Sequence, residues 1–269
     1  MTAAATLPRV PAMATTTKPS SPALLPRAVV TGASAGIGRA LALELACHGV
    51  PVLAVARDAA RLDALAHGQP LITPWPADLS RTGTLDALAA QWLARHPDIG
   101  MLVNNAGVQH DLRVDGPGYA AADIEAEVAL NLLAPLALTR ALLPHLQARE
   151  RAWVVNVGSV LGVCPKPTAA VYSATKAGLR LFTEALRVQL AGSPVRVVHA
   201  VMPLVDTAMA QGRDQGGKIA PEAAAQALVQ GLLAGRQDIA IGKAGPALHL
   251  HRWAPRLLAR MLQRPGSGA

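Results

Sequence analysis

Residues that bind metals or form disulfides are scarce in this sequence. The two cysteines, Cys47 and Cys164, form neither a disulfide framework nor a metal-ligand spacing, and the eight histidines show no ligand spacing either. We therefore expect no metal site. The sparse use of cysteine fits a reducing cytoplasm, which is the location we expect.

Long apolar runs are also missing. No stretch of about 18 apolar residues without charges is present, so the sequence predicts no membrane span. Residues 1–26 are rich in Ala, Thr, Pro and Ser and lack the apolar core of a signal peptide. We expect them to form a disordered leader, with Met13 as an alternative start of the chain.

Acidic residues are absent from both ends of the chain, which has a formal net charge of +8. Residues 1–30 carry three basic side chains and residues 243–269 carry five, whereas residues 31–242 carry 17 basic and 17 acidic side chains. Because only the flanks are basic, the charge does not indicate a nucleic-acid partner.

Short apolar runs alternate with longer helical patterns between these flanks. Most of the runs are continuous rather than alternating, which is typical of strands buried on both faces. The alternation predicts an α/β fold with a doubly wound, seven-stranded parallel sheet and helices on both faces. The expected domain spans 27–242 and is followed by a basic helical extension over 243–269. Candidate strands are 27–31, 51–56, 71–75, 100–104, 152–158, 195–201 and 237–241, and candidate helices lie near 37–48, 58–66, 80–95, 118–147, 173–191, 221–234 and 246–262.

A glycine cluster follows the first candidate strand. The sequence TGASAGIGRA (31–40) places Gly32, Gly36 and Gly38 where the strand turns into a helix. Glycines there permit a tight turn and a close approach of the backbone to a pyrophosphate at the helix N-terminus. The spacing is GxxxGxG, and its position in a βαβ unit predicts a dinucleotide site.

The end of the second candidate strand discriminates between cofactors. Folds that bind NAD usually place an acid there for the ribose 2′-hydroxyl, but this chain has Ala56 followed by Arg57. Arg57, with help from Arg39 and Ser34, fits the 2′-phosphate of NADP(H), unless it is only a solvated residue at the start of a helix. We interpret Asp58 as the N-cap of that helix.

Two further segments are candidates for the adenosine half of the site. Asp78 either binds the adenine amino group or caps a helix that starts near Ser80, and the roles do not exclude each other. The sequence NNAG (104–107) either lines the cofactor or forms a structural turn, because asparagine tolerates left-handed backbone.

Three reactive side chains are expected at one edge of the sheet. Ser159 ends the fifth candidate strand, and Tyr172 lies four residues before Lys176, on the same face of a helix. A cation beside a phenol favours the phenolate, so Tyr172 could act as a general acid or base while Ser159 polarises a substrate oxygen. Asn131 either supports a water chain toward Lys176 or marks a helix kink near Pro135.

These motifs together resemble the short-chain dehydrogenase/reductase family over residues 27–242. The resemblance implies a Rossmann sheet, a nicotinamide cofactor, a homodimer or homotetramer, and Asn131, Ser159, Tyr172 and Lys176 as a catalytic tetrad. Ala56 followed by Arg57 is similar to members that prefer NADP(H), with NAD(H) as a possible substitute. The implied cofactor-binding residues are Gly32, Ser34, Gly36, Ile37, Gly38, Arg57, Asp78, Asn105, Ala106, Gly107, Tyr172, Lys176, Val205 and Thr207.

One loop departs from the family pattern. The family usually reads PGxVxT after the sixth strand, whereas this chain reads MPLVDT (202–207) and keeps only Val205 and Thr207. With the sequence NNAGVQHD (104–111) and the basic tail, this variant resembles the DltE-type subgroup of oxidoreductases.

The expected activity is hydride transfer between NADP(H) and a medium-sized, apolar carbonyl or alcohol. An epimerase or dehydratase on the same fold and a non-catalytic nicotinamide sensor are the alternatives. We expect a homo-oligomer built on 118–147 and 173–191, and a tail that folds over the core or contacts an anionic membrane surface. The expected apolar pocket wall contains Val160, Leu161, Val163 and Cys164.

Overall fold

A computed structural model describes residues 25–211 and 217–258 of the chain. Its centre is a seven-stranded sheet in the order β3-β2-β1-β4-β5-β6-β7, and all neighbouring strands are parallel. This sheet confirms the predicted fold class. The strands are β1 (Arg27–Thr31), β2 (Val52–Ala56), β3 (Ile72–Pro76), β4 (Ile99–Asn104), β5 (Ala152–Ser159), β6 (Val195–Met202) and β7 (Asp238–Ala240).

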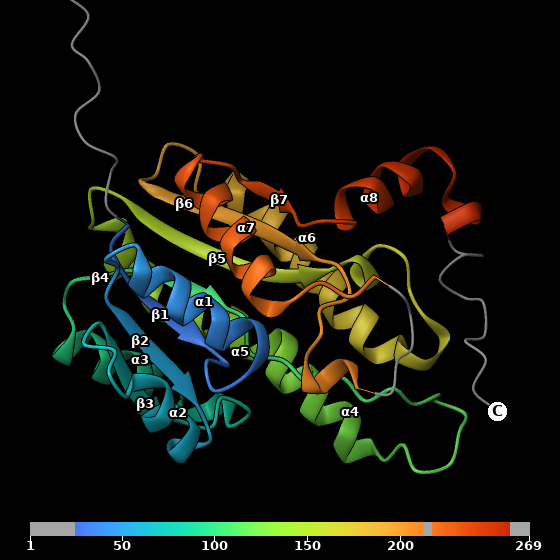
Figure 1. Cartoon of the computed structure of the whole chain (residues 1–269), viewed down its shortest axis with the longest axis horizontal. Coiled ribbons are helices and arrows are strands. Elements are labelled where there is room, and N and C mark those ends of the chain that lie inside the picture. The colour runs from blue at the N-terminus through green and yellow to red at the C-terminus, as the bar shows by residue number, and fades with distance from the viewer. Residues whose placement is uncertain (1–24, 212–216, 259–269) are drawn as a thin grey trace, which may run out of the picture.

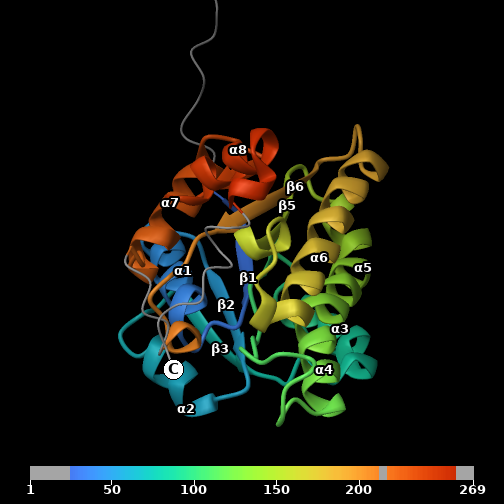
Figure 2. The same ribbon diagram turned by 90° about the vertical axis from the view of Figure 1, so that its right-hand side faces the viewer.

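Helices cover both faces of the sheet and give three layers (Figures 1 and 2). One apolar core lies under α1, α2 and α7, and a second lies under α3, α5 and α6. The α-helices are α1 (Gly36–Cys47), α2 (Ala59–Ala66), α3 (Leu85–Arg95), α4 (Ala121–Val128), α5 (Ala134–Gln147), α6 (Ala170–Gln189), α7 (Pro221–Leu233) and α8 (Ala244–Trp253). The shorter helical turns are η1 (Thr82–Thr84), η2 (Ala129–Leu133), η3 (Val160–Gly162), η4 (Pro167–Ala169) and η5 (Ala208–Ala210).

The helix expected over 118–147 is shorter and is interrupted. Gly118 has a φ of +84°, a left-handed conformation that cannot belong to a right-handed helix, so α4 begins only at Ala121. Between α4 and α5 the chain widens into one π-helical turn, η2, which contains the buried Asn131. Wide turns of this kind are frequent at functional sites, because the extra residue redirects a side chain.

Two other expected helices also differ at their ends. The pattern at 80–95 forms the 3₁₀ turn η1 before α3, and the pattern at 246–262 is broken after α8. Pro255 has no N–H to donate and restricts Ala254, which explains the break before a second helical turn over 255–258. Residues 259–262 lie outside the described part of the chain.

The helical stretch Ala121–Gln147 is long and apolar enough to cross a membrane by length and composition alone. Leu138, Leu142 and Leu146 in its second half are buried against the sheet. Packing in the core therefore accounts for much of its apolar composition.

The ends of the chain bear on the predicted domain boundaries. Most of the expected leader, residues 1–24, lies outside the described residues, and the boundaries at 27 and 242 remain predictions. Within the expected extension, α8 packs against η3, close to the end of β5. The first part of the basic tail therefore contacts the core beside the sheet edge that holds Ser159.

Candidate active site

The glycine loop between β1 and α1 approaches the turn after β4 very closely. A Cβ atom on Gly32, whose φ is +68°, would lie 2.8 Å from the Cα of Ala106. A Cβ atom on Gly38 would lie 2.2 Å from the carbonyl oxygen of Gly32. Neither position can hold a side chain without moving backbone, so the glycines create a shallow cradle of main chain above the sheet.

The N-terminus of α1 points its first N–H groups into this cradle. Ala35 precedes the helix and its methyl group offers no acceptor to these N–H groups, and the first turn contains no acidic residue. The positive end of the helix dipole therefore remains available to an anion.

Two arginines reach the same region, Arg57 directly after β2 and Arg61 from the first turn of α2. Asp58 caps α2 by accepting from the N–H of Arg61 at 3.0 Å, as expected, and its other oxygen lies 3.1 Å from Nε of Arg61. Arg61 thus offsets the charge of Asp58. Arg57 has no salt bridge within the described residues, and both arginines line the same pocket, whereas Arg39 does not.

The turn after β4 is fixed by a threonine of β1. The Oγ1 of Thr31 accepts from the N–H groups of Asn105 and Ala106 at 2.9 and 3.0 Å, and the Asn105 side chain donates to the Thr31 carbonyl at 2.9 Å. Asp78 instead accepts from the N–H and hydroxyl of Ser80, bonds that are the main cause of its lowered pKa. These bonds close a local turn, and the expected cap is wrong because the first helical turn, η1, begins only at Thr82, after Arg81. The adenine contact of Asp78 remains a prediction.

The reactive residues come from β5 and α6. Ser159 ends β5, and its Oγ accepts from the N–H of Leu161 at 3.2 Å. Tyr172 and Lys176 lie one turn apart on α6, with Nζ of Lys176 5.7 Å from the centroid of the Tyr172 ring. The ammonium donates to the carbonyl of Val157 at 2.8 Å, and burial lowers the pKa of Lys176 to about 8.

Asn131 occupies the π turn behind these residues and is fully buried. Its Oδ1 accepts from the N–H of Val108, and its Nδ2 donates to the carbonyl of Val108, both at 2.8 Å. A longer bond of 3.4 Å reaches Oγ1 of Thr175, the neighbour of Lys176. The amide therefore holds the loop after β4, and the expected water chain toward Lys176 remains a prediction.

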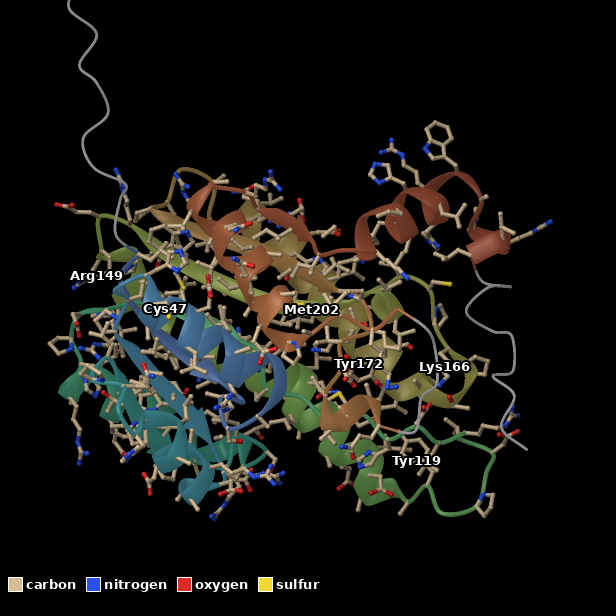
Figure 3. The ribbon with its side chains drawn as sticks, viewed as in Figure 1. Cys47, Tyr119, Arg149, Lys166, Tyr172 and Met202 are labelled. Atoms are coloured by element: carbon tan, nitrogen blue, oxygen red, sulfur yellow. The ribbon has the colours of Figure 1, made fainter. Side chains whose placement is uncertain are left out.

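One pocket of about 700 Å³ joins the glycine loop to the reactive residues. Figure 3 shows Tyr172 at the end of the molecule that also carries Lys166 and Tyr119. Asp78 and Asn131 do not line the pocket. The expected site residues that line it are Gly32, Ser34, Gly36, Ile37, Gly38, Arg57, Asn105, Ala106, Gly107, Ser159, Tyr172, Lys176, Val205 and Thr207.

The far wall of the pocket is only partly as expected. Val160 and Leu161 line it, but Val163 and Cys164 do not, because the turn η3 carries them away from the opening. Burial raises the pKa of the Cys164 thiol, so it is no activated nucleophile. Sequence reasoning did not assign several other wall residues, which come from the end of β6, from η5, from α8 and from loops: Met202, Met209, Ala247, Gln109, Lys166 and Leu204.

Comparison with known proteins gives one consistent family. The family model for the short chain dehydrogenase matches residues 26–217. The chain is 40% identical over 67% of its length to an uncharacterized short-chain type dehydrogenase/reductase, y4eK, of Sinorhizobium fredii, covering 70% of that protein. It is 35% identical over 78% of its length to the uncharacterized oxidoreductase DltE of Bacillus subtilis, covering 86% of it.

A solved structure agrees with these relatives. A short chain dehydrogenase from Burkholderia cenocepacia, in complex with NADP, superposes with a TM-score of 0.78 at 28% sequence identity. The match covers 89% of this chain and 98% of that one. The expected resemblance to DltE-type oxidoreductases is confirmed by the relative from Bacillus subtilis.

The burial of Lys176 has a measurable consequence for stability. Its pKa of about 8 lies below the value of about 10.4 in an unfolded chain, so the folded state binds fewer protons between these pH values. The free energy of unfolding of the wild type must therefore rise through this window. Lys176→Met has no group to titrate at this position. Its stability relative to the wild type should therefore fall by about 2.5 kcal/mol between about pH 7 and pH 10.

Urea unfolding of both proteins at several pH values checks this expectation. Lys176→Met also loses the bond to Val157, which shifts its stability by an amount that does not depend on pH. The informative quantity is therefore the change of the difference with pH, and a difference that stays constant would contradict the assigned burial.

Proposed function

Since the chain belongs to the short-chain dehydrogenase/reductase family, we propose that it is an NADP(H)-dependent oxidoreductase that interconverts a carbonyl and an alcohol. One observation carries the proposal: Ser159, Tyr172 and Lys176 line the same pocket as the glycine cradle. A hydrogen-bond donor, a phenol and an ammonium are thereby placed beside a site suited to a dinucleotide.

The residues of the cradle fit a dinucleotide phosphate. Gly32 and Gly38 leave main chain exposed where a Cβ would clash, and the N-terminus of α1 is free to bind an anion. Arg57 and Arg61 would hold a 2′-phosphate beside the uncharged Ala56, which favours NADP(H) and leaves NAD(H) possible. The superposed dehydrogenase from Burkholderia cenocepacia binds NADP. When bound, the nicotinamide supplies or accepts the hydride.

The side chains divide the remaining work. Tyr172 donates a proton to the substrate oxygen during carbonyl reduction and removes one during alcohol oxidation. Ser159 donates a hydrogen bond to the same oxygen, and the charge of Lys176 favours the phenolate of Tyr172. Asn131 holds the loop after β4 and supports a water path toward Lys176, and Val205 and Thr207 would contact the carboxamide of the nicotinamide.

The pocket wall indicates the kind of substrate. Val160, Leu161, Met202, Leu204 and Met209 make one side of it apolar, which favours a medium-sized apolar carbonyl or alcohol. Assays of aldehydes, ketones and alcohols, followed by NADPH absorbance, test this substrate preference. The assay buffer should have the ionic composition of the cytoplasm, because the cytoplasm is the location that we propose. Cofactor binding without turnover of any compound would favour the nicotinamide sensor instead.

Tyr172→Phe tests the proposed proton transfer. The substitution keeps the ring and removes the hydroxyl, so kcat should fall about 100-fold or more, while the Kd for NADPH stays nearly unchanged. Steady-state kinetics and fluorescence titration with NADPH measure the two quantities. Wild-type turnover by the Phe variant would overturn the assignment of Tyr172.

Ala56 and Arg57 test the cofactor preference. Ala56→Asp places a carboxylate against a 2′-phosphate, and Arg57→Ala removes a charged partner, so both should raise KM for NADPH about 10-fold or more and affect NADH less. The matched control is Arg39→Ala, because Arg39 does not line the pocket. A wild type that already prefers NADH would contradict this account.

Helices α5 and α6 are the proposed contact between subunits of a homodimer or homotetramer. Leu179 and Leu186 of α6 are buried in the subunit, whereas Leu181 and Val188 on its outer face are 56% and 78% exposed. A second copy of the chain would cover this apolar surface.

Light scattering checks the oligomer. The wild type should give the mass of a dimer or tetramer at micromolar concentration, and Leu181→Glu with Val188→Glu should give a monomer, because charges at a buried contact are costly. Val114→Glu, an equally exposed apolar position on a loop, is the control. A monomeric wild type with intact activity would refute the proposal.

A further inference from the structure

A buried carboxylate lies one turn before Asn131. Glu127 of α4 is completely buried, although an unpaired carboxylate in the protein interior is unfavourable. One oxygen accepts from the backbone N–H of His110 and lies 3.4 Å from Nδ1 in the side chain of the same residue. The other accepts from the hydroxyl of Tyr119 at 3.0 Å.

Both partners of Glu127 belong to the long loop between β4 and α4. Tyr119 is the only tyrosine of the sequence besides Tyr172, and burial together with the bond to Glu127 raises its pKa to about 12. It therefore remains a hydrogen-bond donor at any working pH. The ring of His110 also lies 3.8 Å from Asp123, so α4 contacts it with two carboxylates.

These bonds place Gln109 between two fixed points. On one side, the backbone of Val108 exchanges two bonds with the side chain of Asn131. On the other side, the backbone N–H of His110 donates to Glu127, which lies four residues before Asn131 and therefore on the same side of the helix. Gln109 lies between them, and it lines the pocket. Its main chain is therefore fixed to α4 and η2 on both sides.

The next residue of the loop, Asp111, is bonded to the segment that directly precedes α6. Asp111 accepts from Nζ of Lys166 at 2.9 and 3.1 Å and from the hydroxyl of Thr168. Lys166 lines the pocket too, and Figure 3 shows it at the same end of the molecule as Tyr172 and Tyr119. Loop residues 108–111 thus connect α4 and η2, which carry Glu127 and Asn131, with the segment that follows Ser159.

We propose that Glu127 is a positioning residue that presents Gln109 to the substrate, and that Gln109 is a specificity-determining contact. The carboxamide of Gln109 can both donate and accept a hydrogen bond, so it favours carbonyl substrates that carry a second hydrogen-bonding group on an otherwise apolar chain. This inference rests on the proposed carbonyl–alcohol activity and narrows its substrate class.

The kinetic test compares ethyl acetoacetate with 2-heptanone, which have chains of equal length with and without a second carbonyl group. With NADPH, the wild type should show the higher kcat/KM for ethyl acetoacetate, and Gln109→Met should lose most of that preference. Glu127→Ala should reduce kcat/KM for ethyl acetoacetate about 10-fold or more, while the Kd for NADPH stays unchanged. Glu127→Gln, which can still accept from the N–H of His110, should recover much of the loss.

The matched control is Glu125→Ala, because Glu125 lies on the same helix and is exposed. Hydrogen–deuterium exchange supplies a readout that needs neither substrate nor cofactor. Peptides covering 105–119 should exchange faster in Glu127→Ala and at the wild-type rate in Glu125→Ala. If Glu127→Ala does not fold, Tyr119→Phe can replace it. This variant removes one of the two hydrogen-bond donors to Glu127 and should show smaller changes in the same direction.

The outcomes separate this inference from the proposed function. Unchanged exchange over 105–119 in Glu127→Ala would overturn the positioning role, and an unchanged substrate preference in Gln109→Met would overturn the specificity role. A lower melting temperature with normal kinetics would also refute positioning, because it would make Glu127 purely structural. If the wild-type protein reduces no carbonyl, the proposed function is wrong. If residues 105–119 nevertheless exchange faster in Glu127→Ala and not in Glu125→Ala, the positioning role of Glu127 is still supported.

Discussion

The bond between the buried ammonium of Lys176 and the carbonyl of Val157 is the constraint on which the candidate site depends. A lysine so deeply buried is tolerated only with a suitable partner, and here that partner is the main chain near the end of β5. The bond fixes α6 against the strand that carries Ser159. It therefore sets the position of Tyr172, one turn earlier on α6, relative to Ser159.

The close approach of chain segments around this bond has a specific origin. A Cβ atom on Gly162 would lie 2.8 Å from the carbonyl carbon of Lys176, so only glycine lets η3 pass against the backbone of α6. On the other side, Asn131 binds Val108 and Thr175 together, which joins the loop after β4 to α6. The pocket is thus enclosed by three segments that are far apart in the sequence and are held by polar side chains.

Much of this arrangement could be predicted from the sequence, because its signals are local. Continuous apolar runs located every strand to within one or two residues, and TGASAGIG, Ser159 and the Tyr172–Lys176 pair were assigned to one edge of the sheet. Each of these signals depends on a few neighbouring residues and on the rule that parallel strands present their carboxyl ends together.

The remaining features depend on contacts between distant segments. The helix expected over 118–147 starts late because Gly118 is left-handed, and it is interrupted at the π turn whose Asn131 binds Val108; no periodicity encodes either feature. Gln109 and Lys166 reach the pocket from irregular loops, where residue spacing says little about direction. Arg61 is different, because it lies three residues after the predicted N-cap Asp58, and its place in the first turn of that helix, close to Arg57, could have indicated it.

The central claim is that this site transfers a hydride between a nicotinamide and a substrate carbon. The most direct measurement uses NADPH deuterated at C4 of the nicotinamide ring, on each face in turn, with a ketone that the protein consumes. Mass spectrometry of the alcohol should find one deuterium on the carbinol carbon for one face and none for the other. An alcohol or other product that contains no deuterium from either form of NADPH would contradict the account.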